Sequence, residues 1–346
     1  MKVQTDKLAS AVTILGNAVS KNDTKTPLAS AIELSTKDGI LYGYTFDMTN
    51  FLRVEIGPCN EEFLATVEYT QFHSIVKSIK SDEIELTTTK NALNIKSKTV
   101  KCKLPLYVDA NGNIGKAKKA SKPDNVDFTP VDVSKVKSYI PLFKSICRQD
   151  FSVECYRYVY FGSKGILVSD TSNVILINDV LFSEDLLLTM KSISLLSLFD
   201  ECEYYINTEK HVLYISNDTM NLTIVDQNKE LFQYNDMIGL FNSLQIPYQY
   251  KLKASSLSEG LGVSNVFPYN SIFFEFNKDG CWLKMAPVDF VYQVDETPGE
   301  DFVFTTTKDI IKKFFIGKEE LTIDYGIDEL IKVTADNISG IFCKTT

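Results

Sequence analysis

The sequence predicts an α+β protein made of three tandem copies of one domain. A β-hairpin with a turn glycine occurs three times at nearly equal intervals, at Gly39, Gly165 and Gly280. The same elements follow each hairpin: a short strand, a helix of about three turns, and two strands joined by a tight turn. The turn glycines are more than 100 residues apart, whereas solenoid repeats are only about 20–50 residues long. The spacing therefore indicates three copies of a whole domain.

The elements of the first copy follow from the spacing of its apolar residues. An opening helix precedes the hairpin and carries one apolar stripe, formed by Leu8, Val12, Leu15 and Val19. The second helix carries a similar stripe, formed by Phe72, Ile75, Val76 and Ile79. The strands after it alternate between apolar and polar residues, which is the period of a half-buried strand.

The second and third copies repeat this order with two local differences. Pro141 lies inside the opening helix of the second copy, where we expect it to kink or split the helix. Gly260 and Gly262 weaken the opening helix of the third copy, so we expect that helix to be short. Each copy is predicted to contain two helices and roughly eight strands.

Composition indicates where the domains begin and end. Residues 110–126 are predicted as a linker, because this segment is polar and rich in glycine, lysine and asparagine. Residues 229–247 are predicted as a second junction, more apolar and suited to packing against a domain. The three domains are therefore expected at residues 1–109, 127–228 and 248–346.

Bulk properties exclude several classes of protein. The chain has 346 residues, 44% of them hydrophobic and 23% charged, as in ordinary multidomain globular proteins. It has no run of about 18 apolar residues and no signal-peptide pattern, so we expect a cytoplasmic protein without membrane contact. The seven cysteines are scattered singly, which favours reduced thiols over disulfides or zinc. No metal or cofactor is predicted.

Residues that could form a catalytic centre do not converge in the sequence. The two histidines, His73 and His211, lie in no triad or HExxH pattern, and there is no phosphate-binding loop. Acidic pairs such as Glu61 and Glu62 are expected to be solvated surface groups. We therefore predict that the protein is not an enzyme.

Basic residues gather on one side of predicted helices in all three copies. On any single helix, one-sided basic residues are explained by a face exposed to solvent. Their recurrence in all three copies favours a common positive surface, on a chain whose net charge is −9. Such a surface suits sequence-independent contact with a phosphate backbone. The predicted DNA-binding residues are Lys21, Lys25, Lys77, Lys80, Lys137, Lys144, Arg148, Lys308, Lys312 and Lys313.

The order of elements resembles that of a known family over essentially the whole chain. The segments that carry the similarity are TKTPLASAIELSTKDGILYGYTFDMTNFLRVEI, ATVEYTQFHSIVKSI, VKCKLPL and GILVSDTSNVILI. They resemble the bacterial-type DNA sliding clamp, the β processivity subunit of the replicative DNA polymerase. The resemblance implies three clamp domains, each with two helices packed on two antiparallel β-sheets. Together these form half of a closed ring.

The resemblance also implies how such a ring works and closes. Two chains would form a homodimeric ring around duplex DNA, placed there by a clamp loader, with the helices facing the hole and the sheets outside. The ring would tether a replicative DNA polymerase as its processivity factor. The dimer interface is expected to use Phe72, Val76, Val100, Cys102, Val263, Val266 and Phe267.

A groove for partner peptides is implied between the second and third domains. Its expected residues are Cys155, Ser169, Thr171, Ser172, Asn173, Val174, Met237, Ile238, Phe342, Cys343, Thr345 and Thr346. Here the chain departs from the family, which has Gly-His-Arg-Leu at 171–174 and Met-Pro-Met-Arg-Leu at its C-terminus. This divergence, with an AT-biased composition, suggests a clamp of a phage or other mobile element, or a diverged bacterial paralogue.

Two other functions are compatible with the same residues. A clamp-like paralogue could act in repair or modulate another clamp, which predicts loss of the basic lining or of one dimer edge. A β-rich multidomain structural protein would lack one-sided basic helices and would carry aromatic clusters on its loops. The lysines and the strand positions of most aromatic residues favour the sliding clamp.

Overall fold

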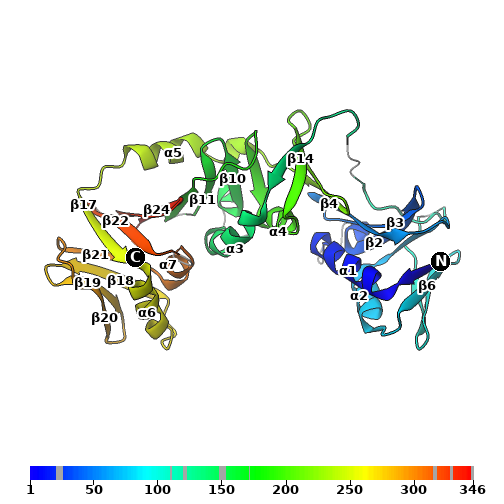
Figure 1. Cartoon of the computed structure of the whole chain (residues 1–346), viewed down its shortest axis with the longest axis horizontal. Coiled ribbons are helices and arrows are strands. Elements are labelled where there is room, and N and C mark those ends of the chain that lie inside the picture. Colours follow the sequence, from blue (N-terminus) through cyan, green and yellow to red (C-terminus); the bar gives the residue numbers. More distant parts are fainter. Residues whose placement is uncertain are drawn as a thin grey trace. The chain divides into compact units, whose positions relative to one another are not determined.

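The computed structural model describes residues 1–20, 26–109, 111–119, 123–147, 153–170, 172–314, 318–327 and 330–343, without the side chains of Lys313 and Ile327. The chain divides into two compact units, whose elements are labelled in Figure 1. Unit 1 comprises Met1–Lys137 and Lys191–Asp226, and unit 2 comprises Ser138–Met190 and Gln227–Thr346. Among the described residues, each unit holds one four-stranded and one eight-stranded antiparallel sheet.

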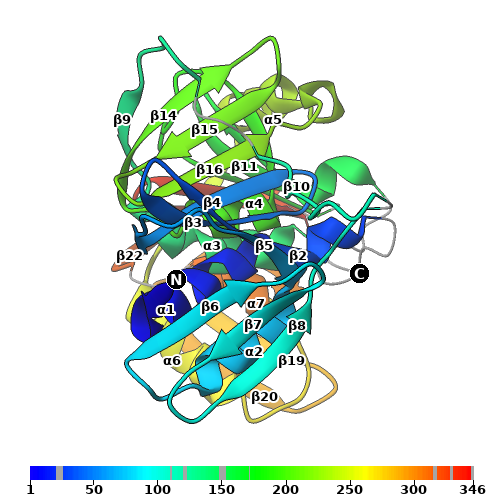
Figure 2. The same cartoon turned by 90° about the vertical axis from the view of Figure 1, so that its right-hand side faces the viewer.

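The sheets of unit 1 combine all strands of the first repeat with half of the second. The four-stranded sheet has the order β1-β6-β7-β8, and Figure 2 shows β6, β7 and β8 side by side. The eight-stranded sheet has the order β5-β2-β3-β4-β16-β15-β14-β9. The strands are β1 (Lys2–Gln4), β2 (Ala31–Lys37), β3 (Ile40–Phe46), β4 (Asn50–Pro58), β5 (Leu64–Glu68), β6 (Glu83–Thr88), β7 (Ala92–Lys96), β8 (Lys101–Pro105), β9 (Thr129–Asp132), β14 (Glu201–Asn207), β15 (Val212–Ser216) and β16 (Met220–Val225).

The helices of unit 1 begin and pack as the apolar pattern predicts. In α1 (Thr5–Leu15), the side chains of Leu8, Val12 and Leu15 are fully buried. At the start of α2 (Tyr69–Ser78), the Glu68 carboxylate accepts hydrogen bonds from two backbone N–H groups, which caps the helix. The shorter helices are η1 (Gly16–Ala18), η2 (Pro27–Ser30) and α4 (Met190–Leu196), which begins at the last residue of a unit 2 segment.

The sheets of unit 2 combine the other half of the second repeat with the third. The eight-stranded sheet has the order β13-β10-β11-β12-β24-β23-β22-β17, and the four-stranded sheet has the order β20-β19-β18-β21. The strands are β10 (Tyr158–Gly162), β11 (Gly165–Ser169), β12 (Asn173–Ile177), β13 (Leu186–Thr189), β17 (Tyr248–Lys253), β18 (Ser271–Asn277), β19 (Gly280–Met285), β20 (Phe290–Asp295), β21 (Phe302–Thr307), β22 (Glu320–Ile327), β23 (Leu330–Ala335) and β24 (Ile338–Cys343).

Two helices differ from their sequence-based expectation. The helix α3 (Ser134–Ile146) continues through Pro141, whose side chain is exposed, because buried residues on both sides of it hold the helix to the sheet. The helix α6 (Ala254–Ser264) is 11 residues long, and Gly260 has a packing role: a Cβ there would lie 2.6 Å from the Tyr292 ring. The remaining helices are η3 (Glu154–Arg157), η4 (Lys229–Leu231), α5 (Tyr234–Ser243) and α7 (Lys308–Phe314).

The strands repeat in three sets of eight, β1–β8, β9–β16 and β17–β24. The turn glycines of the three hairpins, Gly39, Gly165 and Gly280, have φ of 77°, 128° and 126°, a region that favours glycine. The α+β fold and its antiparallel sheets are confirmed. The predicted domain borders stay a prediction, because each compact unit follows an eight-stranded sheet that joins neighbouring repeats.

No helix in the described part of the chain is long and apolar enough to cross a membrane.

Candidate functional surfaces

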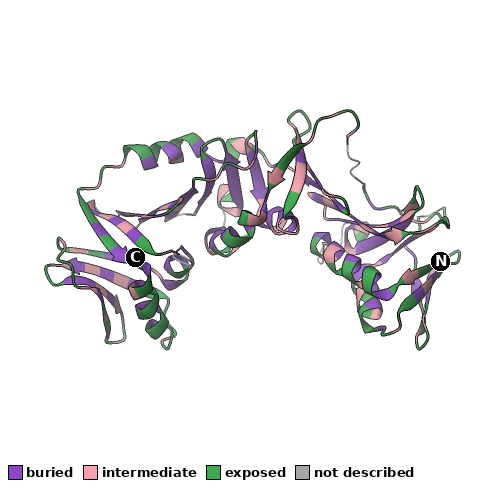
Figure 3. Cartoon of the chain, in the orientation of Figure 1, coloured by how far each residue is buried: buried purple, intermediate pink, exposed green. Residues whose placement is uncertain are grey.

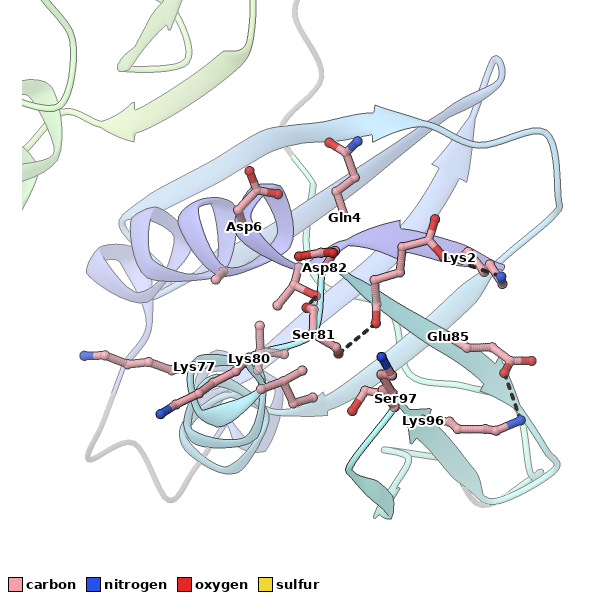
Figure 4. A pocket seen from close by; sticks show the side chains of 16 residues that line it. Lys2, Gln4, Asp6, Lys77, Lys80, Ser81, Asp82, Glu85, Lys96 and Ser97 are labelled. Atoms are coloured by element: carbon pink, nitrogen blue, oxygen red, sulfur yellow. Dashed lines mark hydrogen bonds and ion pairs between the residues drawn. The ribbon is translucent and has the colours of Figure 1, made fainter.

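The second helix of the first repeat presents two of the predicted DNA-binding lysines. Lys77 lies in the last turn of α2 and Lys80 lies just beyond its end, and both are exposed. In Figure 4 the two side chains point to the same side, away from the ion pair between Lys96 and Glu85. Among the described residues neither Lys77 nor Lys80 forms an ion pair, so their charges are available to an external anion.

A surface hollow of about 1110 Å³ lies beside these two lysines. It is not itself a phosphate site, because two of its three other basic groups, all except Lys98, are neutralised locally. Lys2 pairs with Glu83 at 3.4 Å, and Lys96 pairs with Glu85 at 3.4 Å. Asp82 adds a further carboxylate to the lining. The positive surface is therefore the exposed side of α2 rather than the hollow.

The helix α3 of the second repeat also carries exposed lysines. Lys137 and Lys144 lie seven positions apart, which places them near one side of the helix. Lys137 is 2.5 Å from a carboxylate oxygen of Asp200, so part of its charge is balanced within the chain. Lys144 is exposed in the last turn and forms no ion pair with another described residue.

The prediction for Lys308 is wrong. Its side chain is only 8% exposed, and its ammonium donates to the backbone carbonyls of Ser264 (3.2 Å) and Phe267 (3.1 Å). It therefore satisfies the C-terminal end of α6 and cannot reach a phosphate. Lys312, four residues on, is exposed. Lys21, Lys25, Arg148 and the side chain of Lys313 lie outside the described residues.

Four of the predicted groove residues come together on one face of the large sheet of unit 2. Cys155, Val174 and Met237 are partly buried and pack against a cluster that includes Ile238. Backbone pairing adds the last strand, because the N–H of Cys343 donates to the carbonyl of Ser172 at 2.7 Å. The cluster also contains Tyr158, Tyr160, Leu167, Leu176, Leu187, Phe232, Tyr234, Phe241 and Ile341.

Three other predicted groove residues cannot line a groove with their side chains. Phe342 is fully buried and its ring meets Phe314 of α7, which lies on the opposite face of the sheet from the cluster. Asn173 is buried and donates to the carboxylate of Asp170, and buried Ser169 donates to the Asp170 carbonyl. Strand alternation explains the error, since Ile341 rather than Phe342 faces the cluster. Thr171, Thr345 and Thr346 lie outside the described residues.

The sequence argument missed the aromatic residues that fix α5 to this face. The Tyr234 ring stacks on Tyr160 with 4.3 Å between centroids, and its hydroxyl donates to the carbonyl of Gly165 at 3.1 Å. Gly162 permits this approach, since a Cβ there would lie 2.5 Å from the tyrosine ring. In Figure 3, α5 is buried along one side and exposed along the other. The apolar pattern of residues 229–247, predicted as a junction, was the sequence signal that could have revealed this packing.

The cysteines near these surfaces lack the lowered thiol pKa of a reactive cysteine. Burial raises the pKa of the Cys155 and Cys102 thiols, so both stay protonated at neutral pH and act as small apolar groups. Among the described residues, no group of three or more His, Cys, Asp or Glu side chains is arranged to hold a metal ion.

Solved structures of known function share this architecture over the full length. The β chain of DNA polymerase III from Streptococcus pneumoniae matches with a TM-score of 0.83 at 11% identity, covering 100% of this chain and 99% of that one. A DNA polymerase sliding clamp from Bacillus subtilis matches with a TM-score of 0.81 at 13% identity, covering 100% and 98%. The β clamp of Helicobacter pylori, bound to a DNA ligase peptide, matches with a TM-score of 0.80 at 15% identity, covering 100% and 99%.

The chain has the sliding-clamp fold. Neither models of protein families nor the sequences of curated proteins match it, so the likeness rests on structure. The predicted resemblance is confirmed at the level of the fold.

The residues predicted for the interface of a clamp dimer divide into two groups. Phe72 and Val76 are 0% and 1% exposed, so they fill the core of their own repeat and their assignment to an interface is wrong. Val100 and Cys102 are partly buried at or next to the edge strand β8. A separate exposed group lies at the end of α6, comprising Val263, Val266 and partly buried Phe267.

Proposed function

We propose that this protein is a DNA sliding clamp, a homodimeric ring that encircles duplex DNA and tethers a replicative DNA polymerase. The sliding-clamp fold over the whole chain is the observation that carries the proposal. The exposed lysines Lys77, Lys80 and Lys144 supply loose phosphate contacts, and enclosure of the DNA rather than tight binding keeps the ring in place. No catalytic role is part of the proposal.

The way repeats join within the chain supports ring closure by a second copy. In unit 1 the fourth strand of the first repeat, β4, pairs with the eighth strand of the second, β16. In unit 2 the corresponding strands β12 and β24 pair in the same way. The strands that would form a third joint are β20 and β8, and both are sheet edges among the described residues. A second copy of the chain offers each edge its partner.

The register of this third joint follows from the first. In the first joint, Leu52 lies opposite Leu222 on the α1 side of the sheet. The turns before the two strands share the same backbone hydrogen bond: Ser97 N–H donates to the Val100 carbonyl, and Asn217 N–H donates to the Met220 carbonyl. Val100 therefore corresponds to Met220, and Cys102, two residues further on, corresponds to Leu222.

Val291 takes the place of Arg53, because the paired row Phe273, Lys284 and Val291 matches the row Glu33, Tyr44 and Arg53. Phe290 then takes the place of Leu52, and Cys102 is expected opposite Phe290 of a second copy. The neighbouring pair is then Lys101 and Val291, and Val291 is 51% exposed in the single chain. An exposed valine on an unpaired edge strand is what an interface strand would supply.

The cluster in unit 2 is proposed as the docking site for polymerase and other partners. Its partly buried rim of Cys155, Val174 and Met237 suits a short apolar peptide. The Helicobacter pylori clamp, which shares the fold, was solved with a DNA ligase peptide. Loading onto DNA by a clamp loader and a cytoplasmic location belong to the same proposal.

Retention on circular DNA tests the proposed function. The purified protein is loaded onto a nicked circular plasmid with a clamp loader, and the complex is separated by gel filtration before and after the plasmid is cut once. We expect the protein to elute with the circle and to be released when the circle is cut, because a sliding ring leaves at a free end. Equal retention on circular and linear DNA, or none on either, would overturn the proposal.

A further inference from the structure

The outward face of the first repeat's hairpin sheet, the face away from α1, is covered by residues 113–119. The hydroxyl of Thr66 donates to the carbonyl of Gly115 at 2.5 Å. The Glu33 carboxylate, fully buried, accepts the N–H of Ala117 at 2.8 Å and lies 2.5 Å from the ammonium of Lys119. Part of the segment predicted as a linker is therefore bound to the sheet in extended form.

Aromatic contact completes this arrangement. The Lys119 ammonium lies 4.0 Å from the centre of the Tyr44 ring, a cation–π contact. Tyr44 and Phe46 form a small cluster with Ala117. An acidic group, an aromatic face and a strand threonine thus hold a short lysine-bearing segment.

The same face in the second repeat is also covered, but by a helix. Tyr160 stands at the position of Glu33, since each is the third residue of the strand that opens its hairpin. It stacks on Tyr234 of α5, and Leu167 and Leu187 surround it. Here an apolar helix meets an apolar face.

In the third repeat the described residues leave part of the equivalent face exposed. Val291 and Val303 are 51% and 48% exposed, and Trp282 is half-buried with no hydrogen-bond partner for its Nε1 among the described residues. The helix α6 packs on the opposite face, where Tyr292 meets Gly260. Phe273 stands at the position of Glu33 and Tyr160.

The chemistry of this face resembles the first repeat more than the second. Thr305 lies opposite Phe273, as Thr66 lies opposite Glu33. Lys284, on the other side of Phe273, replaces the apolar Leu167 of the second repeat. A helix like α5 would therefore lose its apolar partners here, whereas an extended segment would keep an aromatic surface.

The charge around this face is strongly negative. Between residues 271 and 307 the only basic residues are Lys278 and Lys284, and Lys284 is already paired with Glu275 at 2.6 Å. Besides Glu275 in that pair and Asp295, whose carboxylate accepts the Tyr250 hydroxyl, the acidic residues of the same stretch are Asp279, Asp289, Glu296, Glu300 and Asp301. Such a field attracts a basic polypeptide and repels nucleic acid.

We propose that the outward face of β18–β21 is a second docking surface, which binds an extended, lysine-bearing segment of a partner protein. The segment lies across Phe273 and Trp282 as residues 113–119 lie across the first repeat, with a lysine placed over an aromatic ring. Its charge is balanced by the acidic loops that border the face, because Glu275 is already paired with Lys284. This surface is distinct from the cluster beneath α5.

Binding of short peptides to the full-length protein tests this proposal. The probe is a dye-labelled peptide with the sequence of residues 112–119, GNIGKAKK, compared with a counterpart in which the lysines are glutamates. Anisotropy of the dye measures binding, and fluorescence of Trp282, the single tryptophan of the chain, reports where it occurs. We expect saturable, salt-sensitive binding of the basic peptide alone, with a change in tryptophan emission.

Two variants make the result specific to the face. Phe273→Ser with Glu275→Lys should weaken binding at least about tenfold, the factor that corresponds to 1.4 kcal/mol. Glu209→Lys, a charge change in the exposed β14–β15 turn, should leave binding unchanged.

Three results would overturn the proposal: equal binding of both peptides, unchanged binding by the Phe273/Glu275 variant, or preferential binding of a peptide of residues 232–244, which would identify a helix as the occupant. Retention on circular DNA does not depend on this peptide, so its loss would overturn the proposed clamp function alone.

Discussion

Lys308 shows how one residue type can take opposite roles within a single turn of helix. Its ammonium is buried and bound to two carbonyls at the end of α6, whereas Lys312 extends into solvent. We expect Lys308→Met to lower the free energy of unfolding by about 1–3 kcal/mol, because it leaves buried carbonyls without a donor. Urea denaturation followed by circular dichroism measures this.

Lys312→Met is the matched control for Lys308→Met, since both change a lysine in α7 to the same apolar side chain. We expect it to alter the free energy of unfolding by less than about 0.5 kcal/mol, as is usual for exposed sites. Equal effects of the two substitutions would contradict the capping role of Lys308.

Lys77, Lys80 and Lys144 are the described lysines best placed to meet DNA. Replacing all three with glutamate should weaken retention on circular DNA and reduce the salt dependence of DNA binding, because each lost phosphate contact removes a slope of about 0.9. The unfolding midpoint should change little, since all three side chains are exposed. Binding measured at several salt concentrations tests this.

Lys37→Glu with Lys210→Glu is the control for this charge reversal, because both residues are exposed at hairpin turns rather than on helices. We expect retention close to that of the unaltered protein. If the control variant loses retention as strongly as the helix variant, net charge rather than a basic helix face governs DNA contact.

At the scale of elements, the two joints between repeats predict a third between chains. Lys101 on β8 and Val291 on β20 are expected to face each other across two protomers. The joint places them as the hydrogen-bonded pair equivalent to Asn221 and Arg53, for which antiparallel geometry gives a Cα separation of about 5.5 Å, within disulfide range. Mild oxidation of the Lys101→Cys, Val291→Cys double variant should therefore yield a covalent dimer on non-reducing gels.

Lys101→Cys with Val303→Cys is the control, because Val303 has a similar exposed fraction, 48%, but lies on β21, the other edge of the same sheet. We expect this variant to remain largely uncrosslinked, as should each single variant. Crosslinking of the control as readily as the Val291 pair would rule out the proposed register.

The sequence predicted the elements well because their signals are local. The period of the apolar residues marked α1 and α2, and turn glycines with positive φ marked the hairpins. Burial of single side chains was predicted less well, because it depends on partners distant in sequence. The Phe342 ring packs against Phe314, and the Lys308 ammonium donates to carbonyls more than forty positions earlier in the chain.

Sequence composition did not show that part of the predicted linker binds the first repeat. Residues 110–126 are polar, yet Ala117 is buried and Lys119 is bound to Glu33. A buried carboxylate in a strand is not visible as such in a sequence, since glutamate there usually faces solvent. Only the fold showed that Glu33 and Lys119 meet.

At the scale of the whole molecule, charge is separated by surface rather than balanced throughout. The net charge is −9, yet the exposed side of α2 is basic and the loops that border the third repeat's outward face are acidic. A protein that slides on DNA needs such a separation, because acidic outer surfaces limit non-specific adhesion while basic ones meet the phosphates.

Ring closure should depend on the exposed apolar group at the end of α6 as well as on the strand edges. Val266 is 76% exposed and Val263 is 48% exposed, which costs little in a monomer but offers apolar area to a partner. Replacing both with glutamate should leave the fold intact, because neither side chain is in the core. Light scattering should then report a mass near 39.0 kDa instead of twice that value, and retention on circular DNA should be lost.

The same experiment distinguishes an interface from an unrelated apolar patch. Val180→Glu with Val153→Glu is the comparison, since both residues are similarly exposed, at 57% and 48%, and neither lies in or next to α6, β8 or β20. That variant should remain dimeric and retained. A dimer that survives the α6 substitutions would place the interface elsewhere, and a monomer that still stays on circular DNA would separate DNA retention from closure of the ring by two chains.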